Sequence, residues 1–116
     1  MNSDRRFSRR GFVGGLATAR RIAEFADGQT IPLAPHNISS PVGTLASAHF
    51  CASIPNVLLL EFHASHVPFW NDLVEGVPKP IIHNGFIQVP EASGLGVKLN
   101  EDVARKYARR GEPFFE

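Results

Sequence analysis

The fold class is decided by the stretch Pro55-Asn56-Val57-Leu58-Leu59-Leu60-Glu61-Phe62. Its apolar run lacks the alternation of a half-exposed strand, and this pattern is typical of a strand buried on both faces of a parallel sheet. A second run, 31–34, lies between a glycine and a proline and predicts another buried strand, irregular because Pro32 has no N–H to donate. We therefore expect an α/β fold built on parallel strands.

The residues around these two strands predict helices. Apolar residues recur with a helical period in 16–27, where Asp27-Gly28 is expected to end the helix through a left-handed glycine. Pro41 suits a first helical position with Ser40 as its cap, and predicts a second helix over 42–53. The helix–strand order with short loops is typical of α/β folds. Two buried parallel strands need neighbours at their edges and faces, so we expect a part of a larger sheet.

After His63 the sequence changes to loops and turns. Residues 66–80 are loop-like with a short helical turn around 71–74, and 94–97 is expected to be extended. The Asn84-Gly85 pair predicts a two-residue turn in a β-hairpin over 81–89. A last helix is expected over 101–109, capped by Asn100.

Composition excludes several classes of protein. The 116 residues suit one small domain, with 43% hydrophobic residues, 20% charged residues and a net charge of +1. This near-neutral balance predicts no nucleic-acid partner, and the apolar runs fall far short of the roughly 18 residues of a membrane helix. Cys51 is the single cysteine, which indicates a reducing, cytoplasmic compartment. The alternative is export, because 8–13 resembles a twin-arginine signal, although the short apolar stretch after it continues into Arg20-Arg21.

Two ionisable residues directly follow the predicted strands. His36 and Glu61 would both lie at carboxyl ends of parallel strands, where α/β barrels place catalytic groups. A histidine there can shuttle protons and a carboxylate can accept a hydrogen bond or a proton. The alternative is that both residues only mark where strands reach solvent. His63 and His66 suggest a metal pair by spacing, but we find no suitably placed carboxylate and expect exposed loop histidines and no metal ligands.

Several segments together resemble one family. They are similar to the mandelate racemase/muconate lactonizing branch of the enolase superfamily, and above all to its acid-sugar dehydratases that act on galactonate or gluconate. The segments that carry the resemblance are 31–37, 39–47, 55–63, Gly14-Gly15 with 20–23, 69–73 and 90–99. The resemblance divides the chain into 1–13, an unmatched basic N-terminal segment, and 14–116, the C-terminal part of an enolase-like barrel domain with its tail.

The resemblance implies a fold and a chemistry. The chain would be a C-terminal fragment of a TIM-type (β/α)8 barrel, about the last two βα units plus the tail, whereas a complete barrel needs about 250 residues. The family removes the proton α to a carboxylate with the help of Mg²⁺ and then expels the β-hydroxyl. By resemblance, His36 would be the acid/base, Glu61 would hydrogen-bond near the substrate carboxylate, and Asn37, Ser39 and Pro41 would border the aldonate substrate.

Departures from the family pattern predict an incomplete site. The strands that would carry the Mg²⁺ carboxylates have no counterpart here, and Arg9 stands where the family has the aspartate that orients the histidine. A cation there would lower the proton affinity of His36. We therefore expect a partial sugar-acid dehydratase, inactive alone, that needs a complementing polypeptide or forms a homo-oligomer. The alternative is a small non-enzymatic or exported interaction domain.

Overall fold

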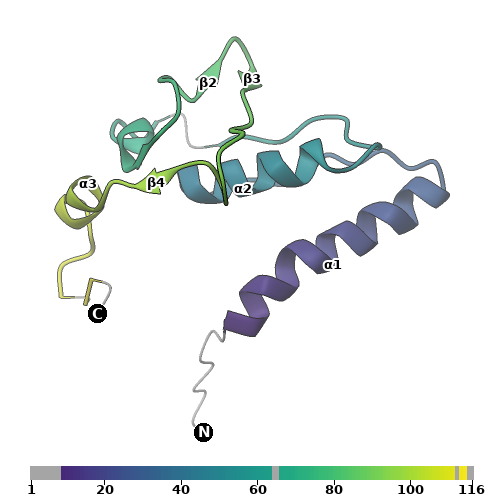
Figure 1. The fold of residues 1–116 in the computed structure, drawn as a ribbon, viewed down its shortest axis with the longest axis horizontal. Coiled ribbons are helices and arrows are strands. Elements are labelled where there is room, and N and C mark those ends of the chain that lie inside the picture. Colours follow the sequence, from purple (N-terminus) through teal and green to yellow (C-terminus); the bar gives the residue numbers. More distant parts are fainter. Residues whose placement is uncertain (1–8, 64–65, 112, 115–116) are drawn as a thin grey trace, which may run out of the picture.

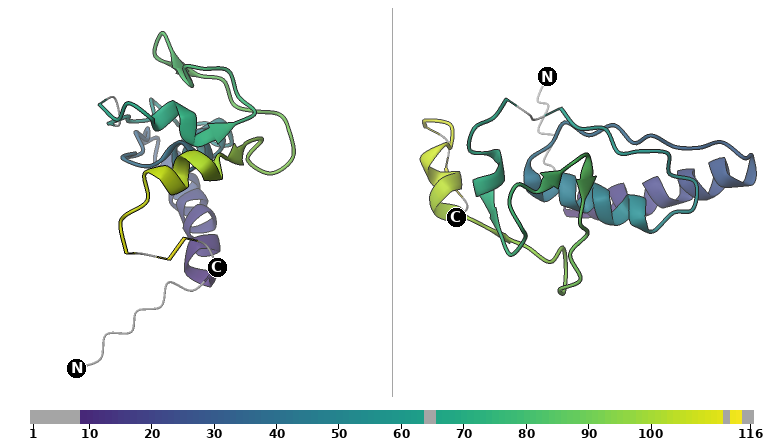
Figure 2. Two further views of the ribbon diagram at one scale, coloured as in Figure 1. Left: turned by 90° about the vertical axis from the view of Figure 1, so that its left-hand side faces the viewer. Right: turned by 90° about the horizontal axis from the view of Figure 1, so that it is seen from above.

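The computed structural model describes residues 9–63, 66–111 and 113–114, with side chains described from residue 15 onward. Figure 1 shows α2 beside the C-terminal segments, while the N-terminal end of α1 projects away from α2; the left-hand view of Figure 2 also shows α1 running downward from α2. In chain order the elements are the helices α1 (Arg9–Gly28) and α2 (Pro41–Ala52), the 3₁₀ turn η1 (Trp70–Leu73), the strands β1 (Val74–Glu75), β2 (Ile82–His83), β3 (Phe86–Ile87) and β4 (Lys98–Leu99), and the helix α3 (Glu101–Lys106).

The predicted start of α2 is confirmed. The Ser40 hydroxyl accepts a hydrogen bond from the Gly43 amide at 3.4 Å, and Pro41 occupies the first turn, where no N–H is needed. A side chain at position 43 would collide with Ser39, since an added Cβ would lie 2.7 Å from the Ser39 Oγ. The small residue therefore lets the loop before α2 fold closely over its first turn.

The end of α1 differs from the prediction. The helix starts earlier than expected, at Arg9, and its left-handed stop is Thr30, with φ 57°, rather than Gly28. The amide of Ile31 bonds to the Ala26 carbonyl and the amide of Thr30 bonds to the Asp27 carbonyl, both at 2.9 Å. These two bonds form a Schellman motif, which requires a left-handed residue at the position that Thr30 occupies.

The two predicted strands lie parallel and are hydrogen-bonded, but they are short and irregular. Leu33 and Val57 form a parallel bridge, in which the Leu33 amide bonds to the Asn56 carbonyl and the Leu58 amide to the Leu33 carbonyl, both at 2.7 Å. Pro32 and Pro35 on either side have no N–H, so the ladder does not continue regularly. The expectation that the second strand is buried on both faces is wrong in this chain, because Leu58 is 70% exposed and Leu59 51%.

The core lies between α2 and the segment that follows the parallel pair. Its buried residues are Leu45, Trp70, Val74 and Ile81. The Trp70 indole also donates to the Ser39 carbonyl at 3.1 Å, which joins this segment to the loop before α2. The C-terminal chain therefore packs on α2 and fixes the loop that carries the candidate site.

Turn chemistry shapes the C-terminal region largely as predicted. Strands β2 and β3 form the expected hairpin, with positive φ at Asn84 and Gly85, and Asn100 caps α3 through a bond from the Val103 amide. Strand β1 pairs antiparallel with β4. The extended conformation expected for 94–97 is wrong, since Gly94 and Gly96 have φ near 70° in a turn. An added Cβ at position 96 would also lie 2.3 Å from the Pro90 Cβ.

Helix α1 keeps a narrow contact with the rest of the chain. Arg20, Arg21 and Glu24 face solvent as expected, but the buried residues are the small Ala23 and Ala26, while Phe25 is 74% exposed. Among the described residues no helix is long and apolar enough to cross a membrane.

Candidate functional site

The pairing of the two parallel segments places the two predicted catalytic residues, His36 and Glu61, opposite each other. The Glu61 amide donates to the Pro35 carbonyl at 3.1 Å, whereas a regular ladder continued from the bridge at Leu33 would use the amide of Leu60. One extra residue is thus accommodated in the second segment, as in a β-bulge. This shift places Glu61 opposite His36, two residues that are 25 positions apart in the sequence.

The side chains of this pair are in direct contact. The His36 Nδ1 lies 2.5 Å from the Glu61 Oε2, and the side chains are 70% and 39% exposed. An ionised carboxylate has no proton to donate, so the Nδ1–H of the imidazole is the donor. In the neutral imidazole this leaves Nε2 as an acceptor, the state in which the ring acts as a base.

The charge state of Glu61 follows from its neighbours. The hydrogen bond with His36 has the largest effect and lowers the pKa of the Glu61 carboxyl below its ordinary value, while desolvation raises it by less. Attraction to His36 and a hydrogen bond with His63 lower the pKa further. Glu61 is therefore ionised at neutral pH.

The structure adds His63 to this pair. The His63 Nε2 lies 3.6 Å from the same Glu61 oxygen, and its ring is tilted by 46° to that of His36 at a centroid distance of 5.6 Å. The prediction that His63 has no suitable carboxylate partner is wrong. Glu61 and His63 are two residues apart in an extended segment, a spacing that places side chains on the same face and that could have revealed the pairing.

Polar side chains in the loop after His36 form hydrogen bonds with one another and with α2. Asn37 is buried, with 3% exposure, and bonds through Nδ2 to the Thr44 hydroxyl at 3.1 Å, while its Oδ1 accepts from the Ser39 hydroxyl at 2.5 Å. Pro41 is fully buried and Ser39 half-buried. These three residues hold the loop in shape beside His36, and their predicted contact with substrate stays a prediction.

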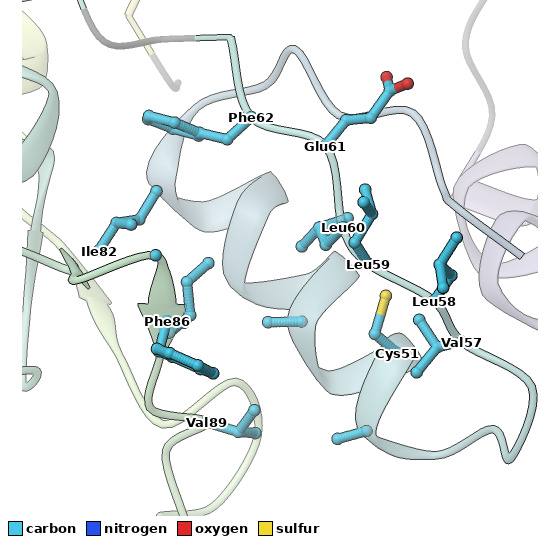
Figure 3. Close-up of a pocket in the computed structure, with 14 residues that line it drawn as sticks. Cys51, Val57, Leu58, Leu59, Leu60, Glu61, Phe62, Ile82, Phe86 and Val89 are labelled. Carbon is cyan, nitrogen blue, oxygen red and sulfur yellow. The ribbon is translucent and has the colours of Figure 1, made fainter.

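A hollow of about 480 Å³ lies on the other side of the second segment. Its lining is mostly apolar and comes from α2, from residues 57–62 and from the hairpin β2–β3; it includes Cys51, whose thiol pKa is raised by burial. Figure 3 shows the Glu61 carboxylate turned away from these apolar side chains. The polar site and the apolar hollow are therefore separate features of the same segment.

Arg9 does not lie at the end of a strand. It is the first residue of α1, and its side chain lies outside the described part of the chain, as do residues 1–8 with the start of the twin-arginine-like segment. The partner that the structure gives to the His36 Nδ1 is Glu61.

Comparison with known proteins identifies the family. Residues 10–103 match the family described as Enolase C-terminal domain-like, and the chain belongs to this family. It is 45% identical over 104 residues to the D-xylonate dehydratase of Haloferax volcanii and 29% identical over 101 residues to the D-gluconate dehydratase of Thermoproteus tenax. The resemblance found in the sequence motifs is confirmed: the chain corresponds to the C-terminal part of an enolase-superfamily sugar-acid dehydratase.

Solved structures agree with this assignment. The mandelate racemase/muconate lactonizing enzyme-like protein from Rubrobacter xylanophilus is 48% identical and superposes on 87% of this chain with a TM-score of 0.82. The mandelate racemase/muconate lactonizing enzyme from Jannaschia sp. CCS1 is 36% identical over 86% of the chain, with a TM-score of 0.71. The chain covers 26% and 25% of these two proteins, and 25% and 20% of the two dehydratases. The predicted fold class, a part of a TIM-type barrel, is confirmed.

Proposed function

We propose that this chain supplies one edge of the active site of a sugar-acid dehydratase, with His36 as the acid/base and Glu61 as the carboxylate that orients its ring. The observation that carries the proposal is the 2.5 Å contact between the His36 Nδ1 and the Glu61 Oε2 at the ends of two parallel segments. The names of the matched dehydratases support an aldonate as the substrate class.

The chemistry of this pair suits proton transfer. Dehydration removes the proton α to a carboxylate and the hydroxyl from the neighbouring carbon, so one proton and one hydroxyl leave as water. With Nδ1–H donated to Glu61, the His36 Nε2 can take up a proton and later return it to the leaving hydroxyl. The ionised Glu61 stabilises the imidazolium between these two events.

The magnesium ion implied by the family does not fit the described residues. Mg²⁺ requires oxygen ligands in near-octahedral geometry, whereas the cluster of three possible ligands among the described residues has two imidazoles and one carboxylate. We therefore propose that this chain is inactive alone and that its magnesium ligands belong to a complementing polypeptide. The exposed faces of Leu58 and Leu59 support a partner that covers them.

A complementation assay tests this proposal. The chain, alone and mixed with a polypeptide that carries the preceding three quarters of a related dehydratase, is incubated with Mg²⁺ and a panel of aldonates, and 2-keto product is measured. We expect turnover only in the mixture, lost with His36→Ala and retained with His83→Ala, because His83 lies on the hairpin. Turnover by the chain alone that disappears with His36→Ala would overturn the inactivity of the isolated chain. A mixture that stays active with His36→Ala would overturn the role of His36.

The alternative of a small non-enzymatic or exported domain gains no support from the comparisons, since the matched relatives are dehydratases.

A further inference from the structure

Three metal-ligating side chains meet at one exposed point of the chain. Ligand atoms of His36, Glu61 and His63 all lie within 4.8 Å of one another. The side chains are 70%, 39% and 52% exposed, so an ion from solvent reaches them without any opening of the fold. They come from the two segments that the parallel bridge holds together.

The spacing of the three groups is close to that of a metal site. Zinc binds imidazole nitrogen and carboxylate oxygen at about 2.0–2.2 Å, so two ligands of a tetrahedral ion are roughly 3.4 Å apart. The His63 Nε2 and the Glu61 Oε2 are 3.6 Å apart and need little movement. The His36 Nδ1 must give up its proton and move away from its 2.5 Å contact by roughly 1 Å, which an exposed side chain can do by rotation.

The chemistry of the donors selects the class of ion. Two imidazoles and one carboxylate suit borderline metals such as zinc, cobalt and nickel, whereas magnesium and calcium require oxygen ligands. Glu61 supplies one carboxylate oxygen and a negative charge that offsets part of the charge of the ion. Three protein ligands leave a fourth position for water.

We propose that His36, Glu61 and His63 form a binding site for a divalent transition-metal ion such as Zn²⁺. This site is distinct in ligand chemistry from the magnesium site of the proposed dehydratase. It uses the same His36 and Glu61 side chains, so a bound ion would replace the Nδ1–H hydrogen bond that the proposed proton transfer requires. The site depends on the bulge that brings Glu61 level with His36, since in the regular register Leu60 would lie there.

Titration of the full chain with ZnCl₂ by isothermal calorimetry tests the site. We expect one tightly bound Zn²⁺ per chain, with affinity reduced by more than about tenfold in His36→Ala, Glu61→Gln and His63→Ala. His83→Ala is the matched control, because it also removes one exposed histidine, and its affinity should equal that of the original chain. A large excess of MgCl₂ should not compete.

The visible absorption spectrum of bound Co²⁺ gives a second measurement, which does not depend on the heat of binding. Co²⁺ at the site should show the visible bands of a low-coordinate complex, and these should disappear with His63→Ala while circular dichroism is unchanged. The absence of Zn²⁺ binding, or equal affinity in His63→Ala and His83→Ala, would overturn the inference. Zn²⁺ binding without activity in the complementation assay would support this inference and contradict the proposed function. Activity in that assay without Zn²⁺ binding would support the proposed function and contradict this inference.

Discussion

Helix α2 buries a large apolar side chain, whereas helix α1 leaves large apolar side chains exposed. On α2, Leu45 is fully buried against Trp70 and Val74, so this helix and the C-terminal region complete a small core within the chain. On α1, Leu16, Ile22 and Phe25 are at least half exposed, and contact is made through small residues such as Ala23.

The two parallel segments, 31–36 and 57–62, are intermediate between α2 and α1 in how far their apolar side chains are buried. Their backbones are paired with each other, but Ile31, Leu58 and Leu59 are half or more exposed. A strand pair of a barrel has neighbours on both edges and both faces. The region around α2 therefore completes a core within the described chain, whereas α1 and the parallel pair leave large apolar side chains exposed.

The largest effect is expected from a matched pair of leucine truncations. Leu45→Ala should lower the free energy of unfolding by about 2–5 kcal/mol, because it opens a cavity in the core. Leu58→Ala removes the same atoms from a side chain that is 70% exposed and should cost less than about 0.5 kcal/mol. Urea unfolding followed by the fluorescence of Trp70, the single tryptophan, measures both. Similar losses in the two variants would break the comparison between the regions.

A smaller effect is expected where α1 is attached to the parallel pair. The Asn56 amide donates to the Ala23 carbonyl at 3.1 Å and to the Ile31 carbonyl at 3.0 Å. Asn56→Ala leaves these carbonyls without the donor and should cost about 1–3 kcal/mol. Hydrogen exchange should show faster exchange in the last turns of α1 and little change in α2. An exposed control, Gln88→Ala, should leave both helices unchanged, and equal loosening of α1 and α2 would contradict the view that they are separately supported.

An increase in stability is expected at the end of α1. Thr30 is a β-branched residue with φ 57°, a conformation that costs L-residues roughly 1 kcal/mol and glycine almost nothing. Thr30→Gly should therefore stabilise the chain by about 1 kcal/mol. Thr18→Gly, in the exposed interior of the same helix, should destabilise it by a few tenths to about 1 kcal/mol, because glycine is a poor helix former. Thermal melting followed by circular dichroism at a helix band would show shifts of opposite sign, and a loss of stability in both variants would refute the role of Thr30.

The smallest effect concerns the contact between His36 and Glu61, which joins the two parallel segments. Carbon-detected NMR titration should place the pKa of Glu61 below its ordinary value, and His36→Ala should raise it towards that value. Because the folded-state pKa is lowered, the contribution of Glu61 to stability is present above its unfolded pKa of about 4.3 and is lost as pH falls through the folded value. An unshifted carboxyl, or a shift that persists in His36→Ala, would contradict the contact. His83→Ala serves as the control that leaves Glu61 unaffected.

Predictions based on local chemistry were largely correct. The cap formed by Ser40, the turn at Asn84-Gly85 and the cap formed by Asn100 all follow from groups within a few residues of one another. The left-handed stop of α1 was predicted at Gly28, although the structure has it at Thr30. Glycine is a preference at such positions, and the path of the following chain decided which residue took the conformation.

The sequence placed His36 and Glu61 correctly at the ends of two parallel segments, but it missed what depended on the register between them; the catalytic role of the two residues stays a prediction. The sequence identified His36 and Glu61 because each follows an apolar run, and the contact between them is present. It did not identify His63, because the partner of that histidine depends on which face of the second segment looks towards His36. The role of Asn37, Ser39 and Pro41 in substrate binding remains a prediction beside their observed role in the loop.

By itself, the sequence determined the presence of the helices, the N-terminal caps of α2 and α3, the hairpin turn and the family, since these follow from residue type and spacing along the chain. Only the tertiary structure decided that Glu61, rather than Leu60, lies level with His36, that His63 joins them, and that Leu58 faces solvent. The physical reason is that these features depend on pairing between segments about 25 residues apart, where two prolines and one extra residue set the register.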